Sequence, residues 1–268
     1  MVVNLAPSDS PSAFLSYLWL AKNASRLQNL IPDMALLSRF GIGSATIDLI
    51  PDETTVAPGG EVEAHLELEG GAEDQTVDDI EIAVVTRFQA EREDDSYPTQ
   101  YVIWETEFKE GFTVEAGVDR SLNVPPIQVP ATAPVTLGAP EVWIQTGLDI
   151  DWAVDPSDED QLRVVPGSHL QGVLDAMEQL GFALDSVVNA EGDDPSAPVP
   201  FVQRFTFERE APPSEIVLTR ILSDDATLTI QVARPQPEGR LEDRLTIDTD
   251  DAGAIADRLR DEIDALTD

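Results

Sequence analysis

Hydrophobic and polar residues alternate along several short stretches of this chain, and the clearest example is Glu61–Glu69. Its valine, alanine and leucines occupy every second position, and glutamates and one histidine occupy the positions between them. A period of two with one apolar face is typical of a half-buried antiparallel strand. Similar runs occupy residues 80–88, 101–108, 121–124, 142–146 and 161–165. Strands of this kind bury their apolar faces against a second sheet, which predicts a β-sandwich.

The pattern changes after Pro166, where apolar residues recur at helical spacing from Leu170 to Leu180. Ser168 is the predicted N-cap of this helix, and Gly181 is predicted to end it. Five further strand-like runs and a closing helix follow, at residues 182–189, 201–208, 215–222, 227–233, 244–247 and 252–266. The predicted fold class is therefore mainly β: a β-sandwich followed by a smaller α+β domain with a β-meander and two helices.

These patterns divide the chain into residues 1–33, a sandwich domain at 34–166 and an α+β domain at 167–268. Residues 1–33 have no net charge, whereas all of the net charge of −36 lies after them. We interpret 1–33 as a leader or an over-extended gene start outside the fold, with Met34 as a natural beginning. The alternative is an amphipathic anchor at Phe14–Trp19.

Acidic residues dominate the composition, with 52 aspartates and glutamates against 16 lysines and arginines. A folded domain this acidic repels itself in dilute buffer. In molar salt the Debye length falls to about 3 Å, and the repulsion is screened. We therefore expect a protein of a high-salt cytoplasm; an acidic surface that grips basic proteins is the alternative. No basic stripe is present, which argues against nucleic-acid binding. The absence of cysteine excludes disulfides, and no apolar run is long enough for a transmembrane segment.

Several segments resemble the sporulation-control (Spo0M-like) family. They include LLSRFGIGSATIDLI at residues 36–50, APGGEV at 57–62 and PFVQRFTFE at 200–208. The most specific is WIQTGLDIDWAVDPSDEDQLRVVP at 143–166. The resemblance covers the chain from Met34 onward and implies an arrestin-like β-sandwich with a regulatory role exerted through protein contacts. Arg204 stands where the family pattern leads us to expect an acidic residue, so any carried-over charge contact there is in doubt.

Residues for catalysis are scarce in this sequence. It has two histidines and no cysteine, and no phosphate-binding loop, dinucleotide motif or nucleophile elbow occurs. His65 lies on the polar face of its predicted strand, and His169 follows a predicted helix start, so both are expected in solvent. The residues favour a protein that is not an enzyme and that has no cofactor.

An acidic loop at residues 149–160 is the main candidate for ligand chemistry. Asp149, Asp151, Asp155 and Asp158 are candidate ligands of Ca²⁺, which takes oxygen ligands, but their spacing does not match an EF-hand. The same aspartates could instead cap backbone amides in a turn or contact a partner. Trp152, between acidic residues, is expected at the surface, whereas Trp143 is expected in the core.

Two functions follow from these residues. The first is a non-enzymatic cytoplasmic adaptor or scaffold for a protein partner whose identity the sequence does not give. Trp152, Asp155, Asp158 and Arg204 are its candidate partner-binding residues. The alternative is a small-ligand or Ca²⁺-binding sandwich module that uses the loop from Asp149 to Asp160. Exposed sheet edges would also allow a homo-oligomer, which the sequence does not decide.

Overall fold

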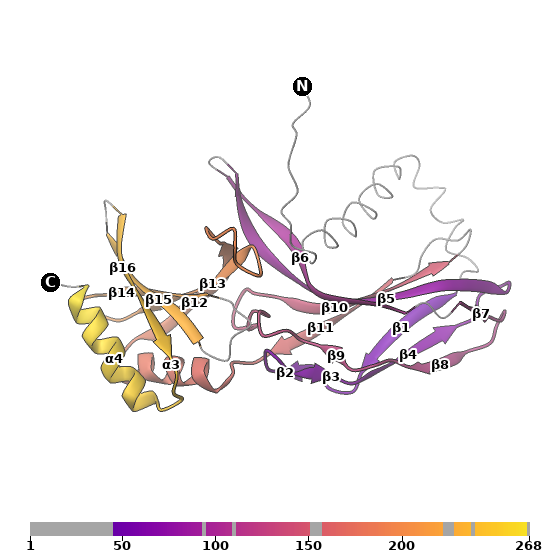
Figure 1. The fold of residues 1–268 in the computed structure, drawn as a ribbon, viewed down its shortest axis with the longest axis horizontal. Helices are drawn as coiled ribbons and strands as arrows, with labels where there is room; N and C mark the ends of the chain where they lie inside the picture. The colour runs from indigo at the N-terminus through magenta and orange to yellow at the C-terminus, as the bar shows by residue number, and fades with distance from the viewer. Residues whose placement is uncertain are drawn as a thin grey trace, which may run out of the picture.

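The structure, a computed structural model, describes residues 45–92, 95–108, 111–150, 157–221, 228–236 and 239–266. In this part of the chain the protein is mainly β, as predicted, with a sandwich at one end and a helix-covered sheet at the other (Figure 1). The predicted region 1–33 lies outside the described residues. None of the helices in the described ranges is long and apolar enough to cross a membrane.

The sandwich is formed by strands that precede residue 166. One sheet has the order β1-β4-β8, with the short pair β3-β9 beside it, and the opposing sheet contains β5, β6, β7, β10, β11 and β2. The bounds are β1 Thr46–Pro51, β2 Thr55–Val56, β3 Glu61–Val62, β4 Ala64–Glu69, β5 Gln75–Arg92, β6 Asp95–Phe108, β7 Phe112–Val114, β8 Arg120–Asn123, β9 Ile127–Gln128, β10 Val142–Ile150 and β11 Ser157–Val164.

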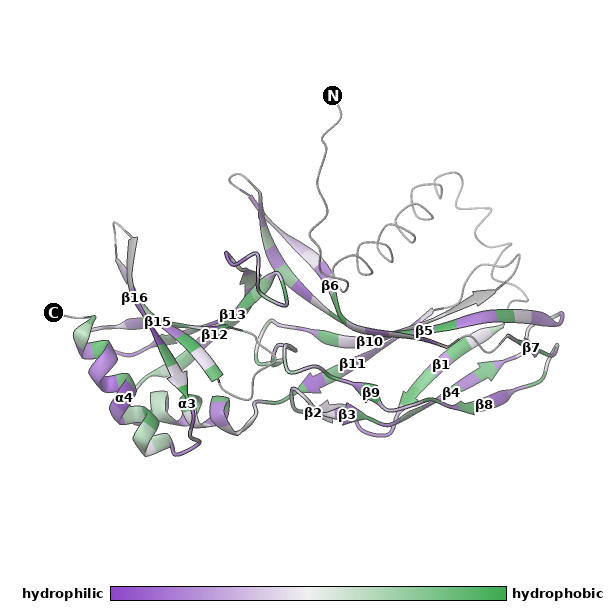
Figure 2. Ribbon diagram, in the orientation of Figure 1, coloured by the Kyte–Doolittle hydropathy of each residue, from purple (hydrophilic) through white to green (hydrophobic). Residues whose placement is uncertain are grey.

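Alternation along β4 explains why this sandwich forms. Ala64, Leu66 and Leu68 are buried in the core, and Glu67 and Glu69 on the other face are exposed. The same green-and-purple alternation runs along β1 and the other sandwich strands in Figure 2. Acidic side chains therefore stay in solvent while the apolar faces of both sheets pack together.

The second part is an antiparallel sheet with the order β16-β15-β14-β13-β12 and two helices. Helices α3 and α4 contact each other, and they pack on one face of this sheet (Figure 1). The bounds are α3 Ser168–Gln179, β12 Ala183–Glu191, β13 Phe201–Glu208, β14 Glu215–Ile221, β15 Leu228–Gln236, β16 Gly239–Ile247 and α4 Ala252–Ala265. The predicted order of helix, meander and helix is thus confirmed.

Strand β5 belongs to both parts of the molecule. Its first half lies between β10 and β6 in the sandwich, and its end reaches β12, with Gln89 opposite Ala190 in a parallel pair. Eighteen residues make it far longer than the predicted run at 80–88. The sequence did not reveal this extension because polar residues after Phe88 interrupt the apolar pattern.

One predicted helix start is wrong. Gly167, not Ser168, is the N-cap of α3, and no side chain caps this end of the helix. Ser168 already has a helical position, so its hydroxyl is one residue too late to serve as the cap. The end of the helix agrees with the sequence, since Gly181 follows it at a φ of 81°, in the left-handed region that glycine tolerates best.

Gly172 of α3 allows the two helices to approach closely. A Cβ atom at this position would lie 2.8 Å from Cδ1 of Ile255 and 2.9 Å from the carbonyl oxygen of Asp250. We expect Gly172→Ala to destabilise the protein, because overpacking costs about 1–3 kcal/mol and outweighs about 1 kcal/mol of improved helix propensity. Thermal unfolding in molar KCl measures the effect. Gly147→Ala, which meets no atom within 4 Å, is the control, and a higher melting temperature for Gly172→Ala would contradict the expectation.

Candidate functional site

The junction between the sandwich and the helix-covered sheet contains buried polar side chains. Gln203 of β13 has no exposed surface. Its Oε1 accepts the backbone N–H of Val135 at 3.1 Å, and its Nε2 donates to the carbonyl of Val135 at 2.8 Å. Val135 lies in the proline-rich crossover that precedes β10. One side chain therefore satisfies both backbone groups of a buried residue that belongs to no strand.

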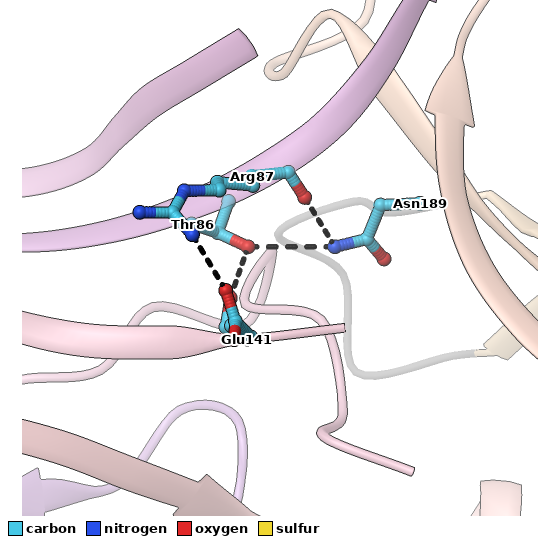
Figure 3. A network of polar contacts seen from close by, with 4 residues as sticks. All are labelled: Thr86, Arg87, Glu141 and Asn189. Atoms are coloured by element: carbon cyan, nitrogen blue, oxygen red, sulfur yellow. Dashed lines mark hydrogen bonds and ion pairs between the residues drawn. The ribbon is translucent and has the colours of Figure 1, made fainter. Parts of the chain in front are cut away.

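Asn189 of β12 extends this junction toward β5. Its Nδ2 donates to the backbone carbonyl of Arg87 at 2.9 Å and approaches the hydroxyl of Thr86, which itself donates to the carbonyl of Glu141 (Figure 3). The Arg87 side chain pairs with the Glu141 carboxylate at 2.9 Å, and its guanidinium lies 5.0 Å from the centre of the Trp143 ring. Trp143 is buried, as predicted.

Arg220 of β14 crosses the same junction as a buried cation. Its guanidinium donates to the carbonyls of Ala131 and Ala133 at 3.2 and 3.3 Å. Burial lowers the pKa of Arg220 to about 10, because the protein interior disfavours the charged form. The junction thus uses two amides and a guanidinium to bind backbone oxygens of β5 and of the crossover. This arrangement is suited to holding the two parts in a fixed register.

A pair of aspartates lies on the core-facing side of β11. Asp158 and Asp160 alternate in register with the buried residues Leu162 and Val164. Oδ2 of Asp158 accepts the backbone N–H of Leu49 at 3.0 Å and so links β11 to β1. Burial, then the charge and a hydrogen bond of Asp158, raise the pKa of Asp160 to about 7. Among the described residues, no group forms a hydrogen bond with the buried Oδ2 atom of Asp160.

The structure tests little of the predicted acidic-loop site. Asp151, Trp152 and Asp155 lie outside the described residues, as does the side chain of Asp149. Asp158 already holds the amide of Leu49. No group of three or more aspartates, glutamates or histidines among the described residues is arranged to hold a metal ion. The cation site on this loop therefore stays a prediction.

The sheet face opposite the helices carries Arg204. Phe205, Leu218 and Val232 point toward α3 and α4, so their neighbours along the strands point the other way. We call this side the open face; on β12 to β16 it includes Val188, Ala190, Val202, Arg204, Thr206, Val217, Thr219, Ile221, Thr229, Gln231, Ala233, Glu242 and Arg244. A cavity of about 210 Å³ lies between this face and the loop that connects β12 to β13.

Arg204 is therefore the predicted site residue that the structure places in a cavity. The junction residues Gln203, Asn189 and Arg220 were missed, although a glutamine and an asparagine at core positions of otherwise apolar strands are a signal for buried polar contacts. His65 is half-buried, with Nδ1 3.9 Å from a carboxylate oxygen of Asp52, and takes no part in the junction.

Known proteins resemble this chain in both sequence and fold. The family model described as SpoOM protein matches residues 34–229. The chain belongs to the Spo0M family. The sporulation-control protein Spo0M of Bacillus subtilis is 31% identical over 177 residues, a match that covers 64% of this chain and just under two thirds, 66%, of the relative.

The crystal structure of Spo0M from Bacillus subtilis shares the fold. Its TM-score is 0.75 at 24% identity, and the alignment covers 84% of this chain and all of that chain. The predicted arrestin-like class agrees with this match. Because the Spo0M family model ends at residue 229, it includes the junction residues, Arg204 and Thr219, but not Gln231 or Arg244.

Removing the amide of Gln203 tests the junction. Gln203→Ala leaves the N–H and C=O of Val135 buried without partners, so we expect a loss of about 2–3 kcal/mol in the free energy of unfolding. Denaturant titration in molar KCl measures it, with Gln128→Ala on an exposed strand position as the control. Equal stability of the two variants would show that the junction is not held in this way.

Asp160 predicts a pH dependence of stability. At low pH the carboxyl is protonated in both states; as pH rises from its ordinary value of 3.8 toward about 7, the unfolded chain releases the proton first and stability falls. Above about pH 7 the carboxyl is ionised in both states, and the full destabilisation caused by the raised pKa remains. We therefore expect Asp160→Asn to raise the melting temperature by a few degrees at about pH 8 and to change it little at about pH 4.

The control for charge removal is Asp119→Asn, at an exposed position of the sandwich. An equal gain for Asp160→Asn at both pH values, or the same gain for the control, would contradict the assignment to burial of Asp160.

Proposed function

We propose that this protein is a non-enzymatic regulatory adaptor of the Spo0M family that binds a protein partner in a high-salt cytoplasm. The observation that carries the proposal is the open face. Helices α3 and α4 cover one side of the β12–β16 sheet, and the other side presents apolar and polar side chains together. Val188 has 39% of its surface exposed there. A face of mixed apolar and hydrogen-bonding residues is compatible with a non-obligate protein interface, which is about as apolar as the rest of a protein surface.

The rigid link between the two parts supports the same function. Strand β5 runs from the sandwich to β12; the buried amide of Asn189 bonds β5, and that of Gln203 bonds the crossover at Val135. A partner on the open face would therefore have a fixed orientation relative to the sandwich. Such geometry suits a scaffold that brings two bound molecules together.

Matched surface variants test the proposal. Affinity purification of the full chain from lysate of its source organism, at the native salt concentration, should give a reproducible partner. We expect Val188→Asp, on the open face, to lose that partner, because it places a charge in the contact. Val118→Asp changes a somewhat more exposed valine (47%) of the sandwich, and this variant should keep the partner.

Two results would contradict the proposal. One is that no protein is enriched above the level of an unrelated acidic control protein. The other is that Val188→Asp and Val118→Asp retain the same partners in equal amounts. Binding of a purified partner by both valine variants would move the contact away from the open face.

A further inference from the structure

The cavity on the open face contains a row of polar side chains that crosses four strands. Arg204 pairs with Thr219, Thr219 with Gln231, and Gln231 with Arg244, each directly opposite its neighbour on the next strand. Residues that are opposite in adjacent strands point to the same side of the sheet. The row therefore presents two guanidinium groups, a hydroxyl and an amide along the floor of one cavity.

Arg204 has hydrogen-bonding capacity that the protein itself does not use. Its Nε is buried, and no group in the described part of the chain forms a hydrogen bond with it. Leaving such a group unpaired is costly, and buried polar groups of folded proteins are almost always bonded. An unpaired Nε is unexpected in a chain with 52 acidic residues, so this atom points to an acceptor supplied from outside.

Two of the three acidic residues that line the cavity, Glu191 and Asp194, have other partners, and the third, Asp193, is exposed. Oε2 of Glu191 accepts the backbone N–H of Glu91, and Oδ1 of Asp194 accepts both the N–H and the hydroxyl of Ser196. The bonds from Ser196, with a smaller contribution from the charge of Arg244, lower the pKa of Asp194. Arg244 thus has a nearby carboxylate, and Arg204 remains the principal cation open to a ligand.

We infer that this cavity binds a carboxylate group, with Arg204 as its main contact and Thr219, Gln231 and Arg244 completing the site. A guanidinium forms two parallel hydrogen bonds with a carboxylate, and a hydroxyl and an amide supply further donors. At about 210 Å³ the cavity is smaller than the pockets of about 300–1,000 Å³ that enclose drug-sized ligands. The cavity therefore fits the end of an acidic side chain or a small acid. Val199 and Val202 form an apolar wall against which the CH₂ groups of such a ligand can pack.

The inference rests on the proposed function, since a carboxylate of a protein partner is the ligand that an adaptor would bind here.

The partial enclosure of the cavity also matters in high salt. Charges at an exposed surface are screened within about 3 Å at molar ionic strength, whereas enclosed pairs are screened much less. A carboxylate site inside a cavity can thus work where surface ion pairs contribute little.

Isothermal titration of the full chain with defined probes tests the inference. The probes are a peptide with blocked ends and one glutamate, the same peptide with glutamine and a free C-terminal carboxylate, and succinate. The blocked glutamine peptide is the neutral control. We expect saturable binding of at least one carboxylate probe, and the probe that binds most tightly distinguishes a side chain, a chain end and a free acid.

Two variants assign the binding to the cavity. Arg204→Gln should weaken the best probe by about tenfold or more, the usual effect of losing a charge-assisted hydrogen bond, and Thr219→Val should weaken it less. Arg163→Gln, an exposed arginine on β11, should bind as the unmodified chain does. Circular dichroism verifies that each variant is folded.

Equal binding of the neutral peptide, or unchanged affinity in both folded cavity variants, would overturn the inference. So would the absence of binding by every carboxylate probe. If a partner is nevertheless captured and lost in Val188→Asp, the adaptor function stands and only the carboxylate site fails. If the probes bind but no partner is captured, the site stands and the adaptor function fails.

Discussion

Gln203 lies completely buried where the sandwich meets the helix-covered sheet, and its amide bonds both backbone groups of Val135. The crossover around Val135 belongs to no strand, so its polar groups need partners from elsewhere. Asn189 likewise donates to the carbonyl of Arg87, and Arg220 donates to the carbonyls of Ala131 and Ala133. Without these bonds the two parts of the molecule would meet over unpaired carbonyls, and the register between them would be lost.

The position of the open face follows from that junction. Strand β12 is fixed beside the end of β5, and β13 to β16 follow it in antiparallel order. Helices α3 and α4 can then cover only the side on which Phe205, Leu218 and Val232 point. The opposite side carries Arg204 and the cavity. The face that packs on the helices and the face proposed for recognition are thus opposite sides of a single sheet.

Acidic residues have two different physical roles in this protein. Most of the exposed carboxylates, such as those of β4, form a hydrated surface. Asp158 and Asp160 instead lie on the core-facing side of β11, where one binds the amide of Leu49 and the other has a pKa raised mainly by burial. Composition alone does not distinguish these roles, because an aspartate counts the same whether its carboxylate lies in solvent or on the core-facing side of a strand.

The sequence by itself determined the mainly β class, the order of strands and helices, and the buried position of Trp143, because these depend on local alternation and spacing. It also identified the family from a long, specific motif. Only the tertiary structure decided that β5 extends to β12, that Gln203 and Asn189 bind backbone groups of distant segments, and that Arg204, Thr219, Gln231 and Arg244 form one row. The first two features depend on contacts between segments about 70 to 100 residues apart in the chain. The row depends on the register of consecutive strands, where a slip of one residue would turn every side chain to the other face.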